Sequence, residues 1–206
     1  LTDGVWTYSL NPLYVQFLGE GQQTVDTTFF TASDDTRQQV SVTITGTNDG
    51  AVISGTDSGF VTEDTSLNTG YLEASGKLEI SDEDFEEDEF DARSYSGTYG
   101  DLNLDTDGSW TYSAFNYQTD LQKLAQGQVT QDAIVVNSID GTTHQITITI
   151  TGTNDAAVIS GIDTGSITED EGLNQDGYLE VSGKLEISDI DSGENYFDAR
   201  IYTGTY

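Results

Sequence analysis

The chain has 206 residues, 37 of them acidic and 6 basic, and its formal net charge is -31. A surface this negative repels phosphate backbones and anionic lipids, which argues against nucleic-acid and membrane-surface binding. There is no apolar run of about 18 residues, so direct membrane insertion is not expected, and the absence of cysteine excludes disulfides and thiolate metal sites.

The predicted elements are short strands with alternating apolar and polar residues, joined by turns. Aromatic residues at 10% favour packed cores over disorder. In chain order we expect a helical turn over 13–18, strands over 40–45 and 99–104, a hairpin turn over 105–108, a strand over 110–112, a second helical turn over 121–125, a strand over 134–136, a hairpin turn over 139–142 and a strand over 145–151. The sequence therefore predicts an all-β fold.

The sequence repeats itself at an offset of about 106 residues. Thr-Gly-Thr-Asn-Asp at 45–49 returns at 151–155, and Gly-Lys-Leu-Glu-Ile-Ser-Asp at 76–82 returns at 183–189. A repeat of this length is a whole domain rather than a solenoid unit, and it has the size of an immunoglobulin-like sandwich. We therefore expect tandem immunoglobulin-like β-sandwich repeats.

Two domain frames are compatible with the repeat. If copies end at the Thr-Gly-Thr-Asn-Asp junction, residues 1–48 are the C-terminal half of one repeat, 49–154 a complete sandwich and 155–206 the N-terminal half of the next. The two halves together then nearly make one further domain. In a permuted frame the modules are 1–99 and 100–206. The junction contains no proline, so it is not a flexible Pro-rich linker.

Acidic and asparagine pairs recur at the ends of predicted strands in both copies. The candidate metal ligands are Asn48 and Asp49 with their copies Asn154 and Asp155, Glu63 and Asp64 with Glu169 and Asp170, and Asp82 and Asp84 with Asp189 and Asp191. Ca²⁺ takes six to eight hard oxygen ligands in a tolerant geometry. Three such clusters meeting at a domain junction would supply that shell, so we predict Ca²⁺ as the cofactor. The alternative is an acidic surface that serves solubility alone.

The most acidic segment shows which carboxylates the repeat keeps. Residues 82–89 hold seven carboxylates in eight positions, whereas the copy at 189–196 keeps the Asp-x-Asp pair and Glu194 and loses most of the rest. Like charges about 5 Å apart repel by roughly 0.8 kcal/mol in water, and by more at a lower dielectric constant. We therefore expect the kept positions to be ligands and the lost ones to be solvated charge.

Aromatic pairs and the single histidine have structural interpretations. Trp110 and Tyr112 alternate on one strand, as do Trp6 and Tyr8, which favours core positions over a sugar-stacking platform. His144 has a glutamine in the other copy, so a catalytic triad or zinc site could exist in one copy only. Because no phosphate loop or nucleophile motif is present either, an enzyme is not expected.

The combination of Val-Thr-Ile-Thr-Gly-Thr-Asn-Asp, Ile-Ser-Gly-x-Asp-x-Gly, Val/Ile-Thr-Glu-Asp, Gly-Lys-Leu-Glu-Ile-Ser-Asp and Asp-Gly-x-Trp-Thr-Tyr resembles the VCBS repeats of bacterial giant adhesins of the RTX type. The resemblance covers essentially the whole chain. It implies cadherin-like or immunoglobulin-like sandwiches in a secreted protein at the bacterial cell surface, where calcium is plentiful. The Asn-Asp, Glu-Asp and Asp-x-Asp pairs also resemble the calcium residues with which cadherin repeats stiffen their linkers.

The leading interpretation is a calcium-stiffened structural extender of a secreted bacterial surface adhesin, with roles in cell adhesion and biofilm formation. Its expected partners are neighbouring repeats of the same chain. Two alternatives remain open. One is a glycan-binding module that uses the tryptophans or the acidic faces. The other is a subunit of an extracellular filament, in which half-repeats of different copies complement one another.

Overall fold

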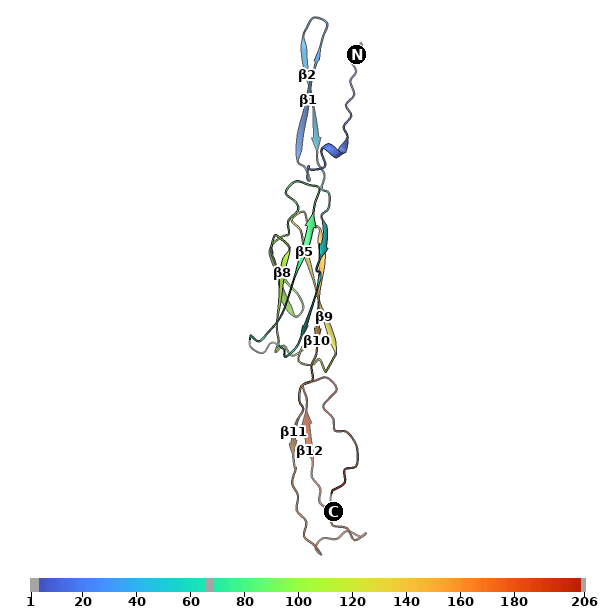
Figure 1. Cartoon of the computed structure of the whole chain (residues 1–206). Coiled ribbons are helices and arrows are strands. Elements are labelled where there is room, and N and C mark those ends of the chain that lie inside the picture. Colours follow the sequence, from blue (N-terminus) through green and yellow to red (C-terminus); the bar gives the residue numbers. More distant parts are fainter. Residues whose placement is uncertain (1–3, 66–68, 205–206) are drawn as a thin grey trace. The chain divides into compact units, whose positions relative to one another are not determined.

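The structure is a computed structural model that describes residues 4–65 and 69–204. Regular structure in it is almost entirely β (Figure 1). The elements are the 3-10 helix η1 (Pro12–Tyr14) and the strands β1 (Gln23–Thr31), β2 (Arg37–Thr45), β3 (Val52–Gly55), β4 (Ser58–Thr62), β5 (Tyr71–Ser81), β6 (Arg93–Ser96), β7 (Gly100–Leu104), β8 (Ser109–Phe115), β9 (Val129–Asn137), β10 (Thr143–Thr151), β11 (Val158–Gly161) and β12 (Leu185–Ser188).

Two of the sheets form a β-sandwich, which confirms the predicted all-β sandwich fold. One has the strand order β4-β10-β9 and the other β3-β5-β8-β7-β6. Alternate residues of β8 and β10 are buried, among them Trp110 and Ile148. The sheets meet closely at Gly59 of β4, where an added Cβ would lie 2.8 Å from Ile148 Cδ1 and 3.3 Å from Trp110 Cη2. The core therefore lies between the two sheets.

The predicted hairpins are present in the sandwich. Asp105 and Gly108 form the turn between β7 and β8, with Gly108 N donating to Asp105 O at 3.0 Å. Gly108 has a φ of +83°, and an added Cβ there would lie 2.2 Å from Leu78 O, so the position requires glycine. Gly141, with a φ of +90°, turns the chain between β9 and β10.

The two helical turns expected from the sequence have different outcomes. The first is the 3-10 helix η1, which has Pro12 at its start and Asn11 as its N-cap. The second is wrong, because residues 121–123 form hydrogen-bonded turns rather than a helix. Leu121 is fully buried there, so the spacing of the apolar residues reflects their burial and not a helix. No helix within the described part of the chain is long and apolar enough to cross a bilayer.

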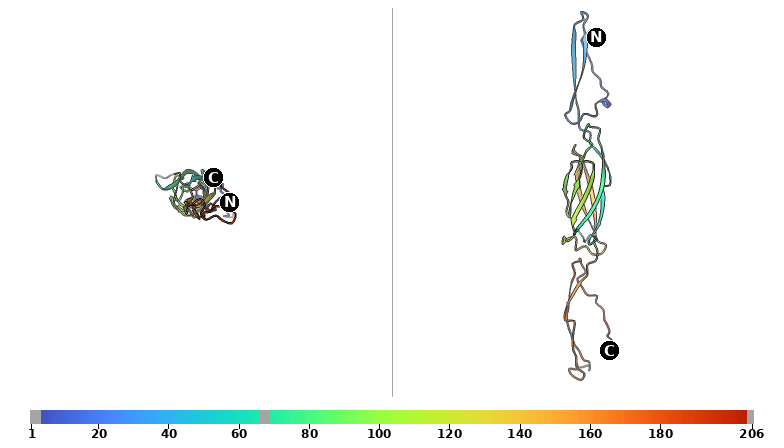
Figure 2. Two further views of the ribbon diagram at one scale, coloured as in Figure 1. Left: turned by 90° about the horizontal axis from the view of Figure 1, so that it is seen from below. Right: turned by 60° about the vertical axis from the view of Figure 1, so that its left-hand side comes forward.

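Two further sheets are two-stranded, β1-β2 and β11-β12 (Figure 1, Figure 2). In the second, β11 pairs with β12 from Val158 opposite Ser188, which reproduces the pairing of β3 with β5 from Val52 opposite Ser81. The repeated sequence therefore pairs its strands in the same register in both places.

The chain divides into two compact units. The first comprises Leu1–Gly59, Glu73–Ala114 and Asp132–Ile148, and the second Phe60–Leu72, Phe115–Gln131 and Thr149–Tyr206. Each unit contains one of the two Thr-Gly-Thr-Asn-Asp segments, at 45–49 in the first and at 151–155 in the second. Each junction therefore lies within a single unit.

Candidate metal centre

Three carboxylates converge in the second unit. Glu63 follows the end of β4, Asp155 lies four residues beyond β10, and Asp191 lies three residues beyond β12. One oxygen of each lies within 4.8 Å of an oxygen of the other two. Glu63 is fully buried and Asp191 is 2% exposed. The end of one strand therefore meets two segments that are distant in sequence.

Backbone hydrogen bonds hold these carboxylates in place. Thr153 N donates to Glu63 Oε1 at 2.7 Å, and Asp155 N donates to Asp191 Oδ2 at 2.8 Å. In turn, Asp191 N donates to Asp189 Oδ1 at 2.9 Å. The local Asp-x-Asp sequence thus closes an Asx turn that presents Asp191 to the junction.

The remaining oxygens of the group lack donors. Glu63 Oε2, Asp155 Oδ2 and Asp191 Oδ1 are buried and accept no hydrogen bond from residues 4–65 or 69–204. An unsatisfied buried acceptor costs roughly 1–3 kcal/mol, and more when it is charged. Three such oxygens in one place could hold a hard cation.

The electrostatics of the group point the same way. Burial raises the pKa of Glu63 from 4.5 to about 7 against the lowering effect of the Thr153 N–H, and the charges of Asp64, Asp155 and Asp191 raise it further. Burial also raises the pKa of Asp155, and the charges of Asp64, Asp191 and Asp189 add to the effect. Negative charge is therefore unfavourable here without a compensating cation.

The basic side chains of this unit are engaged elsewhere. Lys123 pairs with Asp120 at 3.6 Å, and Lys184 pairs with Glu186 at 3.4 Å. Arg200 pairs with Asp198. All three pairs are exposed, so their charges are screened by solvent and leave the buried carboxylates uncompensated.

Asp64 sits beside Glu63 in a polar clamp that sequence reasoning missed. Asn116 Oδ1 accepts from Asp64 N at 3.0 Å, and Asn116 Nδ2 donates to Asp64 Oδ1 at 2.7 Å. Gln122 Nε2 adds a third bond at 3.3 Å. The clamp holds Asp64 at a φ of +58°, a conformation that aspartate tolerates better than most residues. Asn116 could have been found as the copy of Asn11 in the repeat.

The first unit contains the corresponding junction around Asp49, Asp82 and Asp84. Asp49 N donates to Asp84 Oδ2 at 2.7 Å, and Asp84 N donates to Asp82 Oδ1 at 2.8 Å. Asp82 Oδ2 and Asp84 Oδ1 are buried and receive no hydrogen bond from the described chain. The contacts between the Asp-x-Asp segment and the junction aspartate are therefore the same at both junctions.

A further carboxylate lies near this first junction. Burial raises the pKa of Glu87, and the charges of Asp84, Asp82 and Asp140 raise it further. An added Cβ on Gly19 would lie 2.3 Å from Glu87 Oε1, so glycine leaves room for that side chain. No basic side chain within residues 4–65 and 69–204 forms an ion pair with these carboxylates.

The other predicted ligands lie at the edges of these sites or outside them. Asn48 and Asn154 are exposed, and their side-chain amides donate to the carbonyls of Asp49 and Asp155. Glu169 and Asp170 are exposed and do not belong to the converging group. Asp170 nevertheless has a φ of +61°, the same local conformation as Asp64.

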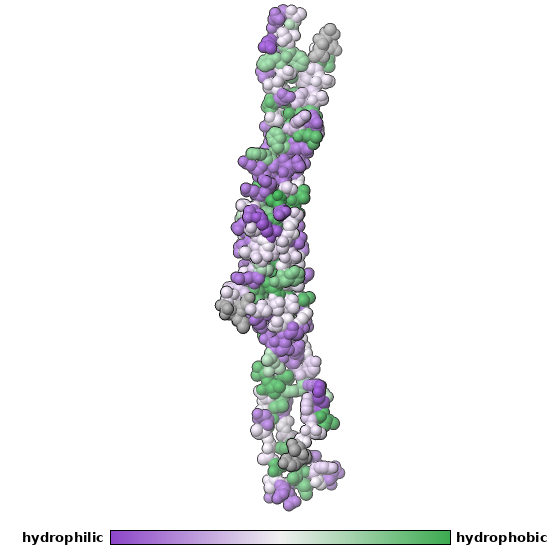
Figure 3. Space-filling view, in the orientation of Figure 1, coloured by the Kyte–Doolittle hydropathy of each residue, from purple (hydrophilic) through white to green (hydrophobic). Residues whose placement is uncertain are grey.

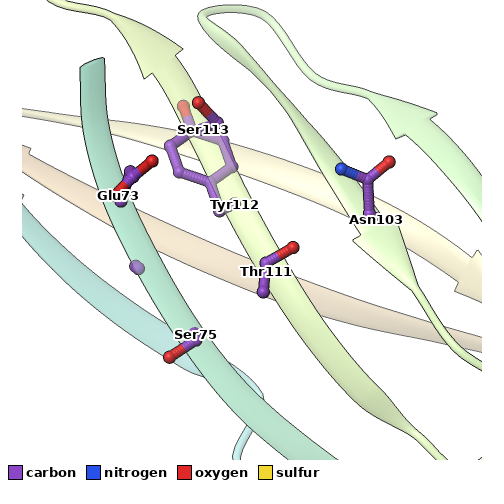
Figure 4. Close-up of a pocket in the computed structure, with 7 residues that line it drawn as sticks. Glu73, Ser75, Asn103, Thr111, Tyr112 and Ser113 are labelled. Carbon is purple, nitrogen blue, oxygen red and sulfur yellow. The ribbon is translucent and has the colours of Figure 1, made fainter. Parts of the chain in front are cut away.

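The alternating aromatic pair of β8 lies in the core of the complete sandwich, as predicted. Trp110 and Tyr112 are each 1% exposed, and Trp110 Nε1 donates to Thr56 O at 2.7 Å. A groove lies over β5, β7 and β8, lined by side chains that include Glu73, Asn103 and Thr111 (Figure 4). It presents no exposed aromatic ring among its labelled side chains.

The family model of the bacterial cadherin-like domain matches residues 48–152. No curated protein matches the chain. Among solved structures it is similar to protocadherin gamma B7 extracellular cadherin domains 1–4, with 15% identity, a TM-score of 0.39 and coverage of 90% of this chain and 44% of that one. It is also similar to a Ca²⁺-stabilised adhesin that helps an Antarctic bacterium to reach out and bind ice, with 11% identity, a TM-score of 0.28 and coverage of 82% and 46%.

The chain thus spans less than half the length of each of these structures. The family model, in contrast, covers half of the chain and the whole of the β-sandwich with the Asp-x-Asp segment at 82–84. The chain belongs to the family of bacterial cadherin-like domains.

Proposed function

We propose that the chain is a calcium-stiffened extender segment of a secreted bacterial surface adhesin. The observation that carries the proposal is the convergence of Glu63, Asp155 and Asp191, with three buried oxygens that have no donor within the described residues. Oxygen-only ligands of this kind suit Ca²⁺, which accepts several carboxylates in a flexible shell.

The positions of the three residues explain how an ion would stiffen the chain. Glu63 belongs to the sandwich, Asp155 to the segment that leaves it, and Asp191 to the segment that follows. An ion held by all three would cross-link these segments and remove the repulsion between their charges. Without the ion, the same charges favour separation of the segments, which makes the junction a calcium-dependent hinge.

The family and the chemistry support the wider setting. Cadherin-like domains are adhesion modules rather than catalysts, and calcium of sufficient concentration is found outside the cell. A surface location, secretion and a role in biofilm formation follow from the resemblance to VCBS repeats of RTX-type adhesins, and they are part of this proposal. The extender would provide length, while other parts of an adhesin would bind the target surface.

The test is differential scanning calorimetry beside small-angle X-ray scattering, each with chelator and with millimolar Ca²⁺. We expect calcium to raise the melting temperature and to give a longer, stiffer particle. Glu63→Gln should lose most of that response, and the exposed Glu73→Gln should keep it. An identical profile with and without calcium would contradict the proposal and leave the acidity as a solubility device.

A further inference from the structure

The second junction contains a main-chain hydrogen bond that lies outside the carboxylate group. The β8–β9 loop, residues 116–128, connects two strands of the sandwich, and the Asp-x-Asp turn, residues 189–194, follows β12. Ser192 N of the turn donates to Lys123 O of the loop at 3.1 Å. Donor and acceptor are both uncharged main-chain groups, so this contact does not require a cation.

The first unit contains the same contact in the other copy of the repeat. Phe85 N donates to Phe17 O at 3.1 Å, and these residues are the counterparts of Ser192 and Lys123. The side chains at both positions differ between the copies, and those of Phe17 and Phe85 are 50% and 63% exposed. Hydrophilic residues gather on the surface between β2 and the sandwich, where this junction lies (Figure 3). The contact therefore depends on the main chain and not on the packing of these side chains.

Glycine brings the β8–β9 loop against the Thr-Gly-Thr-Asn-Asp segment. Gly152 N donates to Gln128 O at 2.8 Å, and Gly127 N donates to Gly152 O at 3.0 Å. A Cβ added to Gly152 would lie 2.1 Å from Leu124 O, so a larger residue does not fit without a shift of the loop. Gly46 has the same role in the first unit, where an added Cβ would lie 2.0 Å from the counterpart carbonyl oxygen. The loop is thus fixed to the segment that leads out of β10.

The Asp-x-Asp turn is attached at two adjacent residues. Asp191 Oδ2 accepts from Asp155 N, and the next residue, Ser192, donates to the β8–β9 loop. Glu194 N donates to Asp191 O at 3.3 Å and closes the turn that carries both contacts. Because one short connection joins the loop to the turn, each contact raises the effective concentration for the other.

We propose that the β8–β9 loop is a docking surface for the Asp-x-Asp turn of the following segment, and that this contact persists when the junction holds no cation. The partner that fits the surface is the next repeat of the same chain, recognised by main-chain geometry. Docking itself does not depend on the proposed calcium function. One consequence rests on that function: the loop is the pivot of the calcium-dependent hinge, so the angle changes with calcium while the contact stays.

Charge explains why such a pivot matters. The Asp-x-Asp turn carries several carboxylates, and Lys123 of the loop pairs with Asp120 instead of with any of them. Without a cation, repulsion within the carboxylate group favours separation of the segments. A hydrogen bond between uncharged main-chain groups is not screened by salt. We therefore expect docking in chelator to be the same at low and at high salt.

The test is amide hydrogen exchange of the full chain, followed residue by residue by NMR in chelator and in millimolar Ca²⁺. We expect the Ser192 and Phe85 amides to exchange at least about tenfold more slowly than unprotected amides in both conditions. Unprotected exchange of both amides in chelator would overturn the proposal, because the contact would then require the ion. Protection in chelator together with no binding of Ca²⁺ would retain docking and contradict the calcium function.

Two alanine substitutions form a matched pair at the first junction. Gly46→Ala should displace the loop and abolish protection of the Phe85 amide in chelator, while the Ser192 amide at the other junction stays protected and shows that the chain is folded. Gly50→Ala is the control, since its added Cβ would have no neighbour closer than 3.4 Å and the other copy already has Ala156 there. It should leave both amides protected. Equal protection of the Phe85 amide in the two variants would contradict docking through this close approach.

Discussion

Identical residues of the repeat have opposite surroundings in the central sandwich and at the ends of the chain. Glu63 is fully buried against two aspartates, whereas its copy Glu169 is exposed. Trp110 is enclosed, whereas Trp6 is half exposed. The difference is therefore not in local sequence but in whether the complementary half of the repeat lies beside it. The sequence of one copy of the repeat is therefore not enough to predict the ligands of a junction. The neighbouring copy must be considered as well, because its segments pack against the first copy there.

The largest expected effect separates the two tryptophans. Trp110→Ala removes a fully buried indole and its hydrogen bond to Thr56, so it should lower the free energy of unfolding by about 3–5 kcal/mol. Trp6→Ala should lower it by less than about 1 kcal/mol, because the side chain is half exposed. Urea denaturation of both variants checks this. Equal losses would contradict the difference in burial between the two tryptophans.

The second effect concerns pH in the absence of calcium. The pKa of Glu63 in the folded chain is about 7, above its ordinary value of 4.5. The folded state therefore keeps a proton that the unfolded state has released, and stability from this group is fully present below about pH 4.5 and is lost as pH rises through 7. The loss is on the order of 3 kcal/mol.

Other carboxylates titrate in the same range, so the measurement is a difference. Melting in chelator should be recorded from pH 4.5 to 8 for the chain and for Glu63→Gln. We expect the chain to lose stability relative to the variant as pH rises. Parallel pH profiles would contradict a buried, proton-binding Glu63.

The third effect is the change in stability caused by Glu63→Gln, which should have opposite signs without and with calcium. In chelator at pH 7.5, Glu63→Gln should stabilise the chain, because it removes a charge from a buried acidic group. In calcium it should destabilise relative to the unchanged chain, which gains about 2.7 kcal/mol when the free ion is at 100 times its dissociation constant. Glu169→Gln should be neutral in both conditions, because Glu169 is exposed and lies outside the group. Destabilisation by Glu63→Gln in chelator would contradict the account.

The smallest effect concerns the single histidine. His144 Nε2 lies 3.4 Å from Asp57 Oδ2 at the edge of the sandwich, and the other copy has Gln38 at this position. His144→Gln should change the free energy of unfolding by less than about 1 kcal/mol, since a polar contact at a partly exposed edge contributes little. A larger loss in urea denaturation would assign the histidine a role that the other copy lacks.

The sequence predicts much of the fold because local pattern and burial agree there. Alternation in β10 places Ile146, Ile148 and Ile150 in the core, and Gly108 and Gly141 mark the hairpin turns. The helical turn expected around Leu121 was wrong because a buried residue in a turn has the same apolar spacing as a helix.

The candidate site was predictable as a set of residue types but not as an assembly. The Asp-x-Asp pairs and the strand-end Glu63 follow from the repeat, whereas the clamp of Asn116 and Gln122 on Asp64 depends on tertiary contacts. Nothing in their local sequence separates Glu63 from Glu169. The difference arises from the segments that pack around them, which a repeat alone does not specify.

The central claim is that the group of Glu63, Asp155 and Asp191 holds calcium. It is tested most directly by titration calorimetry of Ca²⁺ into the chelator-treated chain, run in parallel with Glu63→Gln. We predict saturable binding to the chain and an affinity lower by at least about tenfold in the variant. No binding to the chain, or the same binding isotherm for both proteins, would contradict the account.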